Sequence, residues 1–290
     1  MIRLLYFFTI LLHLFVMKPA NSADLQKGAE AFERGEYAIA LREWMPLAKQ
    51  GDAYAQHNLG VMYRDGLGVP QDYKVAVQHF IASSKQGHLS AILNLGEMNE
   101  NGLGIIQNQK VAFNLYSIAA DQGLAMAQYN LGLMHWNGRG IPQDRTTAAS
   151  WFKRAADQEY PIAQRQLGQI YLAGLGVPQD ILSAFKLFKR SAELGDAAGQ
   201  FYLALMYARP ENLPDQYTTL SLGGAPIQTY ALPGRQDYTR AFIWSTIAAE
   251  QGHKKARKLR DMFADKLPLK ELNKAKFLLR ECINRSLKSC

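Results

Sequence analysis

One eight-residue motif recurs along the chain at a constant interval of 36 residues. Its copies read DGLGVPQD from residue 65, NGLGIIQN from 101, NGRGIPQD from 137 and AGLGVPQD from 173. A fixed period of this length is typical of arrays in which each unit buries its apolar surface only against its neighbours. The interval therefore predicts a repeat protein.

Each unit reads as a pair of helices joined by this motif. In the first helix of a pair, Ala55, Leu59 and Met62 are spaced as an amphipathic stripe, and Ala76 and Phe80 repeat that spacing in the second helix. The columns that keep the register are Leu59, Leu95, Leu131 and Leu167; Gly60, Gly96, Gly132 and Gly168; Ala76, Ala112, Ala148 and Ala184; Phe80, Tyr116, Phe152 and Phe188; and Gly51, Gly87, Gly123 and Gly195, with Glu159 as an exception. Recurrence of Gly60 inside a helix indicates close helix–helix approach, because glycine otherwise weakens a helix.

The recurring motif itself has two interpretations, a phosphate-binding loop or a turn. A phosphate loop needs a third glycine or a Gly-Lys-Ser/Thr ending after a strand, and neither is present. As a turn, Gly66 lets the chain leave the first helix, Pro70 stiffens the loop and Asp72 caps the second helix. The turn interpretation accounts for the motif.

Two units depart from the pattern. The first has only four residues, ERGE, in its turn, and the sixth is interrupted. The distance from Gly195 to Gly252 is 57 residues, so 21 residues have been inserted within 208–235, a stretch with four prolines and three glycines. We expect an irregular, mobile loop there. After Gly252 two further helices are expected, one around Leu259 and one starting at Pro268, which would cap the array.

These columns resemble the Sel1-like repeat family, relatives of the tetratricopeptide repeats. The matching signature is A-x-x-x-L-G-x-x-Y at Ala55, Leu59, Gly60 and Tyr63, then G-x-G-V-P-x-D, then A-x-x-x-F, then Q-G. The resemblance implies an all-α fold, a right-handed α-solenoid of about six helix-turn-helix repeats over 23–252 with a C-terminal helical cap at 253–290. It also implies first helices that line a concave face, and a role like that of the exported bacterial adaptors of this family.

The N-terminal stretch predicts export. Arg3 precedes the uncharged run LLYFFTILLHLFVM, and Lys18, Pro19 and small residues follow. This is the pattern of a signal peptide, with cleavage after Ser22 or one residue later; an uncleaved anchor is the alternative. We expect residues 1–22 to be removed and the mature protein to be periplasmic, or secreted.

Export bears on the two cysteines, Cys282 and Cys290, because oxidising compartments permit disulfides. Eight residues of continuous helix would hold them about 12 Å apart, too far for a bridge. If the helix ends between them, a bridge becomes possible. The sequence leaves both options open.

Charge is concentrated at the C-terminus. The chain has a net charge of +8, and loss of Arg3 and Lys18 would leave +6. Residues 253–290 hold twelve Lys or Arg and four Asp or Glu, which is +8, so the rest of the mature chain is about −2. This basic segment predicts contact with an anionic membrane surface or an acidic partner, or it is the solvated outer face of the cap. Nucleic acid is not expected as a partner of an exported protein.

Eight side chains are candidates for a partner-binding site on the concave face. By analogy with tetratricopeptide grooves they point outward from the first helices, and they vary while the packing columns are kept. A mixed charged and aromatic groove suits a peptide or an extended protein segment, and Trp136 is the most promising member; the alternative is an ordinary solvated helix face. The eight are His57, Arg64, Glu97, Glu100, Tyr129, Trp136, Arg165 and Gln169.

The alternative function is an enzyme or binder acting on β-lactams or cell-wall peptides, as in a cysteine-rich branch of the family. Ser150–Lys153 and Ser183–Lys186 match the S-x-x-K spacing of β-lactamases, but no S-D-N or K-T-G motif accompanies them. The repeat cysteines of that branch are also missing. No catalytic residues, metal site or cofactor are therefore predicted, and the leading hypothesis is a non-enzymatic scaffold in cell-envelope assembly or signalling.

Overall fold

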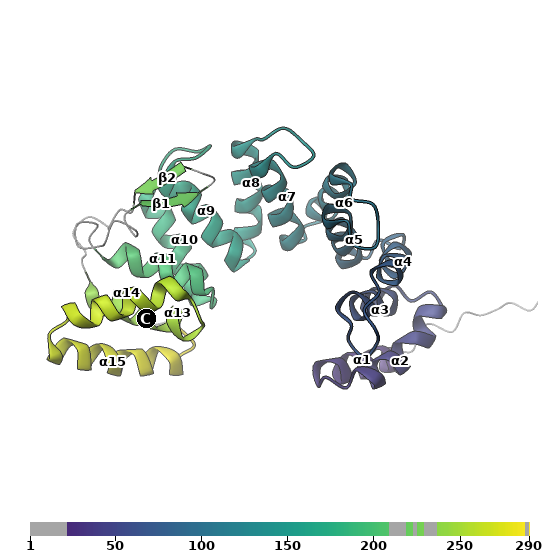
Figure 1. Cartoon of the computed structure of the whole chain (residues 1–290), viewed down its shortest axis with the longest axis horizontal. Coiled ribbons are helices and arrows are strands. Elements are labelled where there is room, and N and C mark those ends of the chain that lie inside the picture. The colour runs from purple at the N-terminus through teal and green to yellow at the C-terminus, as the bar shows by residue number, and fades with distance from the viewer. Residues whose placement is uncertain (1–21, 209–218, 223–224, 229–236, 288–289) are drawn as a thin grey trace, which may run out of the picture. The chain divides into compact units, whose positions relative to one another are not determined.

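A computed structural model describes residues 22–208, 219–222, 225–228, 237–287 and 290. The predicted signal peptide thus lies outside the described residues, apart from Ser22. The chain divides into two compact units, residues 1–88 and 89–290, and each is described by itself (Figure 1).

The first unit contains four helices. They are α1 (Ser22–Glu33), α2 (Tyr37–Lys49), α3 (Ala53–Asp65) and α4 (Tyr73–Ser84), and each packs against the next. Trp44, Leu59 and Met62 are buried in its core. Residues 53–88 form one full helix pair of the predicted kind.

The second unit continues the same alternation. Its helix pairs are α5 (Leu89–Asn101) with α6 (Gln109–Asp121), α7 (Ala125–Asn137) with α8 (Arg145–Asp157), α9 (Pro161–Ala173) with α10 (Ile181–Glu193), and α11 (Ala197–Tyr207) with α13 (Tyr238–Glu250). The helices α14 (Lys254–Lys266) and α15 (Leu269–Asn284) both pack on α13. The observed architecture confirms the predicted all-α solenoid.

The recurring glycines inside first helices let an aromatic ring lie directly on the helix backbone. A Cβ atom added to Gly60 would lie 2.5 Å from the ring of Phe80, and one added to Gly132 would lie 2.7 Å from the ring of Phe152. These distances are far inside van der Waals contact, so only glycine fits. The predicted close approach of the two helices in each pair is confirmed.

The motif from residue 65 forms a turn, as predicted. Gly66 ends α3 in the left-handed conformation, at φ 71°, and Gly68 follows with φ 72° beside Tyr37. The Asp72 side chain accepts hydrogen bonds from the backbone N–H groups of Lys74 and Val75 and so caps α4. The motif is a structural joint, repeated with each helix pair.

The inserted segment contains a β-hairpin, so the expectation of an irregular loop is wrong for residues 219–228. Strand β1 (Thr219–Leu222) pairs antiparallel with β2 (Ala225–Gln228) in the register that sets Leu222 opposite Ala225. A sequence signal existed, because two glycines stand between the strands, and Gly-Gly is a favoured two-residue hairpin connection. The prolines of the segment obscured it. The other inserted residues lie outside the described part of the chain.

The C-terminal helices include the site of the two cysteines. Helix α15 ends at Asn284, between them, and Cys282 and Cys290 form a disulfide with their Cα atoms 5.2 Å apart. Cys282 is buried, so the bridge fastens the end of the chain to the cap. Among the described helices, none is both long and apolar enough to cross a membrane.

Candidate protein-binding face

The first helices of residues 89–290 present one common side, which we call the first-helix face. Residues three positions apart on a helix are neighbours on its surface, so three such residues in succession form an oblique row along the helix. The 36-residue register places equivalent rows on successive first helices. In α5, α7 and α9 the face is formed by Asn94, Glu97 and Glu100; Asn130, Leu133 and Trp136; and Gln166, Gln169 and Leu172.

Two predicted site residues are buried, which corrects the expectation that they point outward. Trp136 is only 4% exposed and belongs to the main apolar cluster of this unit, with the Arg145 guanidinium 5.2 Å from its ring centre. Gln169 is 5% exposed and donates a hydrogen bond to the hydroxyl of Tyr202. The analogy with open grooves failed here because neighbouring elements cover the end of α7 and the middle of α9.

Three further predicted residues belong to pairs that connect the first helix of a repeat with the last residue of the same repeat. His57 stacks on His88 with ring centroids 4.7 Å apart, and the Tyr129 and Tyr160 rings meet edge to face at 5.6 Å. In the next repeat Arg165 forms an ion pair with Asp196 at 2.8 Å. The two members of each pair are 31 residues apart in the chain, so all three occupy the same place in the fold.

The variation at these positions therefore has a structural explanation. Where one member changes, its partner changes with it, from His–His through Tyr–Tyr to Arg–Asp. The same two positions hold Leu93 and Leu124, which pack in one apolar cluster. The side chain at the position of His57 therefore varies from repeat to repeat because its contact partner varies with it. This is sufficient to explain why the position changes while the packing positions of the repeat are kept.

Burial governs the electrostatics of these pairs. It lowers the pKa of His57 to about 4, with smaller effects from its neighbours, and also lowers the pKa of His88. Burial likewise raises the pKa of the Tyr129 and Tyr160 hydroxyls. The histidine pair is therefore neutral near pH 7 and acts as an apolar contact.

The two predicted acidic residues lie on the open part of the first-helix face. A Glu100 oxygen accepts a hydrogen bond from the Tyr116 hydroxyl at 2.8 Å, and the other accepts from Arg139 at 2.8 Å. Burial, with the nearby Glu100 and Glu97 charges, raises the pKa of Tyr116. The half-buried Glu97 also contributes to the raised pKa of Tyr160. Glu97 therefore lies near Tyr116 of α6 and near Tyr160, the residue that precedes α9.

The remaining predicted residue, Arg64, lies in the first unit. Its Nε atom is 2.7 Å from a carboxylate oxygen of its neighbour Asp65, and its side chain is 27% exposed. Because the two units are not placed relative to one another, Arg64 and His57 are not assigned to the first-helix face of residues 89–290.

A column of carboxamides was missed by the sequence interpretation. The signal was available, because Asn58, Asn94, Asn130 and Gln166 are spaced by 36 residues. Three of them, Asn94, Asn130 and Gln166, lie on the first-helix face. A carboxamide can both donate and accept, which matches the alternating N–H and C=O groups of a peptide backbone.

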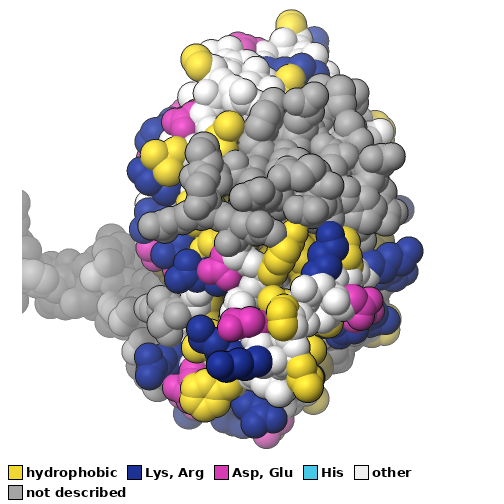
Figure 2. All heavy atoms as spheres, turned by 90° about the vertical axis from the view of Figure 1, so that its left-hand side faces the viewer, with side chains coloured by type: hydrophobic (Ala, Val, Ile, Leu, Met, Phe, Trp, Pro, Cys, Tyr) yellow, Lys and Arg dark blue, Asp and Glu magenta, His cyan; other side chains and the backbone are white. Residues whose placement is uncertain are grey.

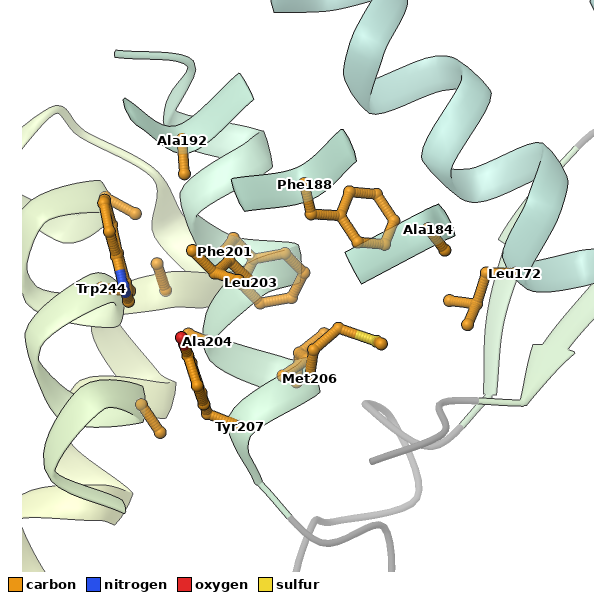
Figure 3. Close-up of a cluster of buried hydrophobic side chains, with 14 of the residues drawn as sticks. Leu172, Ala184, Phe188, Ala192, Phe201, Leu203, Ala204, Met206, Tyr207 and Trp244 are labelled. Atoms are coloured by element: carbon orange, nitrogen blue, oxygen red, sulfur yellow. The ribbon is translucent and has the colours of Figure 1, made fainter. Parts of the chain in front are cut away.

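The β1–β2 hairpin lies against α9 (Figure 1). On the covered helix Gln166 is 9% exposed, Gln169 5% and Leu172 1%. Of the equivalent residues of α7, Asn130 and Leu133 are half-buried, whereas Trp136, which corresponds to Leu172, is 4% exposed. Figure 3 shows Leu172 at the edge of the buried cluster that continues through Phe188 and Met206. An extended segment of this chain therefore occupies one part of the first-helix face.

The two serine–lysine matches do not form a catalytic pair. The Ser150 hydroxyl donates to the carbonyl of Thr147, and the Lys153 ammonium contacts Asp157, which raises the pKa of Lys153. A general base would need a lowered pKa. The Ser183 hydroxyl donates to the capping carboxylate of Asp180. Ser150 is therefore bonded to the backbone inside α8, and Ser183 contributes to the N-terminal cap of α10.

Metal ligation finds no support in the described part of the chain. No group of three or more His, Cys, Asp or Glu side chains is placed there to hold a metal ion.

Comparison with known families identifies the repeat. The family model described as Sel1 repeat matches residues 53–88, 89–124, 125–160, 161–196 and 230–253. The chain belongs to the Sel1 repeat family. The matched segments end at the repeat boundaries seen in the structure, and the fifth match resumes after the β-hairpin. Among proteins of curated function, none matches the chain significantly.

Solved Sel1 repeat proteins share the fold. A Sel1 repeat protein from Oxalobacter formigenes superposes with a TM-score of 0.65 at 29% identity, over 83% of this chain and 87% of that one. A protective antigen of uropathogenic Escherichia coli with an SLR fold gives a TM-score of 0.63 at 27% identity, over 91% of this chain but 53% of its own. Sel1 repeat solenoids are a protein-interaction scaffold fold, which is the functional class of this chain.

Proposed function

We propose that this Sel1 repeat protein is an exported, non-enzymatic scaffold that binds an extended segment of a partner protein along the first-helix face of residues 89–290. The observation that carries the proposal is that the β1–β2 hairpin lies against α9, the helix whose Gln166, Gln169 and Leu172 side chains are buried. A surface that accepts two strands of its own chain has the width and chemistry for a strand-like segment of another.

The open part of the face adds specificity. Asn130 and the half-buried Glu97 and Leu133 offer hydrogen bonding, negative charge and apolar contact within two neighbouring helices. Glu100 is tied to Tyr116 and Arg139 and is already oriented. A partner segment with a basic residue beside apolar ones complements this arrangement.

Export remains part of the proposal. The charged start, apolar run and small residues of the first 22 positions support it. Periplasmic location, with secretion as the alternative, and a role in envelope assembly or signalling follow from the family resemblance. The partner is accordingly sought in the cell envelope.

Photo-crosslinking tests the face directly. A photoreactive residue is placed at Glu97 or Leu133, and matched controls carry it at Lys153 of α8 or Lys189 of α10, which are exposed on second helices. After irradiation in the envelope fraction, adducts are identified by mass spectrometry. We expect the same partner at both first-helix positions and at neither control. Adducts that form equally well at Lys153 and Lys189 would refute the first-helix face.

A further inference from the structure

The outer side of α15 exposes apolar side chains that a cap helix would normally cover or lack. Ala275 and Cys282 are buried on its inner side, against α13. On the rest of the helix, Leu269 is 74% exposed, Phe277 62% and Ile283 48%. With Leu278, α15 holds four of the twelve large exposed apolar side chains among the described residues. This concentration on one terminal helix indicates a contact surface.

Cations surround these apolar groups. Lys270, Lys274, Lys276 and Arg280 are exposed on α15, and no ion pair joins any of them to another described residue. The acidic residues of the helix are fewer, and one of them, Glu281, is already paired with Arg285. Figure 2 shows Lys and Arg side chains interspersed with hydrophobic ones over the lower part of this end of the molecule, where α14 and α15 lie.

A hollow of about 350 Å³ opens beside Phe277, between α13 and α15. Ile243, Phe277 and Leu278 give it apolar walls, and Arg240 and Arg285 lie at its edge. Each arginine has a carboxylate neighbour, since Arg240 lies 3.6 Å from Asp237 and Arg285 lies 3.5 Å from Glu281. Both guanidinium groups are nevertheless about half exposed or more.

We propose that the outer side of α15 docks on an anionic phospholipid bilayer, with Phe277 and Leu278 entering the interface and the surrounding lysines against the headgroups. Interfacial helices combine Phe or Leu side chains that enter the membrane interface with Lys and Arg that face anionic headgroups, and α15 exposes both kinds of side chain. At a bilayer interface the burial of an exposed phenyl ring and the attraction of the lysines to anionic headgroups act together. The inference goes beyond the proposed function, because α15 is not part of the first-helix face.

Vesicle co-sedimentation tests the proposal. The chain from Ser22 onward is used, because the apolar run at residues 4–17 would itself bind lipid, and every buried core residue described lies after Ser22. The probes are vesicles of phosphatidylglycerol with phosphatidylcholine, and of phosphatidylcholine alone. We expect binding to the anionic vesicles to be at least about tenfold tighter, and to weaken with salt.

Two variants separate the charge from the apolar contact. Reversing Lys270, Lys274 and Arg280 to Glu should reduce binding by about tenfold or more, and Phe277→Ser should reduce it by about threefold or more. The matched controls are Lys110→Glu and Ile106→Ser, which change an exposed cation and a 90% exposed apolar side chain elsewhere in the same unit.

Unchanged circular dichroism and melting establish that the variants fold. Equal binding to both kinds of vesicle, or equal losses in the controls, would overturn the proposal. The proposal would also be overturned if the charge-reversed variant lost vesicle binding while the Phe277→Ser variant kept all of it. Binding would then be electrostatic, with no insertion of the phenyl ring. Capture of acidic protein or DNA with no vesicle binding would reassign the surface to a macromolecular partner.

Discussion

A recurring glutamine pair shows how single residues join the two ends of one repeat. Gln56, Gln128 and Gln200 each accept a hydrogen bond from a glutamine at the end of the following second helix, at 2.8 to 2.9 Å. The donors are Gln86, Gln158 and Gln251, which stand before the glycine position of the repeat. In the fourth pair the acceptor is Gln164, but the donor position holds Leu194.

The missing donor leaves a defect in the core. The Oε1 atom of Gln164 is buried without a hydrogen-bond partner among the described residues, while its Nε2 atom donates to the carbonyl of Ala156. An unsatisfied buried acceptor costs free energy that a correctly placed donor recovers.

We therefore predict that Leu194→Gln stabilises the protein by about 0.5–1.5 kcal/mol, the value of one recovered hydrogen bond. Leu194 is 44% exposed, so little apolar burial is lost. The free energy of unfolding is measured by urea denaturation. Leu194→Ala is the control, because it removes the leucine without adding a donor. A glutamine variant no more stable than the alanine variant would contradict the prediction.

At the scale of helices, the paired positions at the two ends of each repeat tolerate different chemistry because each pair is satisfied internally. An ion pair, two tyrosines, two leucines or two histidines fill the same place. The histidine version differs from the others in one respect, because histidine is the only one of these side chains whose unperturbed pKa lies near neutral pH. Burial makes the charged form of His57 unfavourable.

We predict that the histidine pair makes the stability of its repeat depend on pH. His57 has a lowered pKa of about 4 in the folded state, against 6.5 for an unperturbed side chain. Between these values the unfolded chain binds more protons, so the free energy of unfolding falls as the pH drops from about 6.5 towards about 4. Above about pH 6.5 this contribution is fully present. His88 has the same direction of shift.

The double variant His57→Leu with His88→Leu should lose less stability on acidification, because it copies the Leu93–Leu124 pair of the next repeat. Urea midpoints at about pH 7.5 and about pH 5 give the comparison. Replacing Tyr129 and Tyr160 by Leu is the matched control, since tyrosines do not titrate in this range. An acid sensitivity equal to that of the wild type in the histidine variant would exclude the pair as its source.

At the scale of the whole chain, an insertion of 21 residues has changed which part of the array is accessible. The β-hairpin lies against α9, and the side chain of Gln169 in that helix is 5% exposed. The repeats themselves continue around it, because α11 and α13 pack as a normal pair. The array accommodates the insertion because it lies in a turn, outside the packed helix pair.

We predict that replacing residues 219–228 by a short Gly/Ser linker uncovers α9. The two native cysteines are paired, so Gln169→Cys introduces the chain's single free thiol. Its labelling by a polar maleimide should be about tenfold faster or more in the chain without the hairpin, because reaction otherwise requires local opening. Ile106→Cys, at a 90% exposed position, should label at the same rate in both chains. Equal rates at position 169 would mean that the hairpin does not cover it.

The sequence by itself determined the repeat and its local structure. A period of 36 residues, Gly60 beside Phe80 and Asp72 at a helix start each depend on contacts within one helix pair, and such local rules can be read from one chain. The Gly-Gly connection of the hairpin and the carboxamide column were also present in the sequence, although they were overlooked.

Only the tertiary structure decided which side chains are accessible and which are paired. Trp136 and Gln169 are buried by elements from other parts of the chain, and Arg165 is held by Asp196, 31 residues away. The bridge from Cys282 to Cys290 likewise depended on where α15 ends. Exposure depends on what packs against a residue, and a periodic sequence specifies the repeated contacts while leaving an inserted segment free to cover some of them.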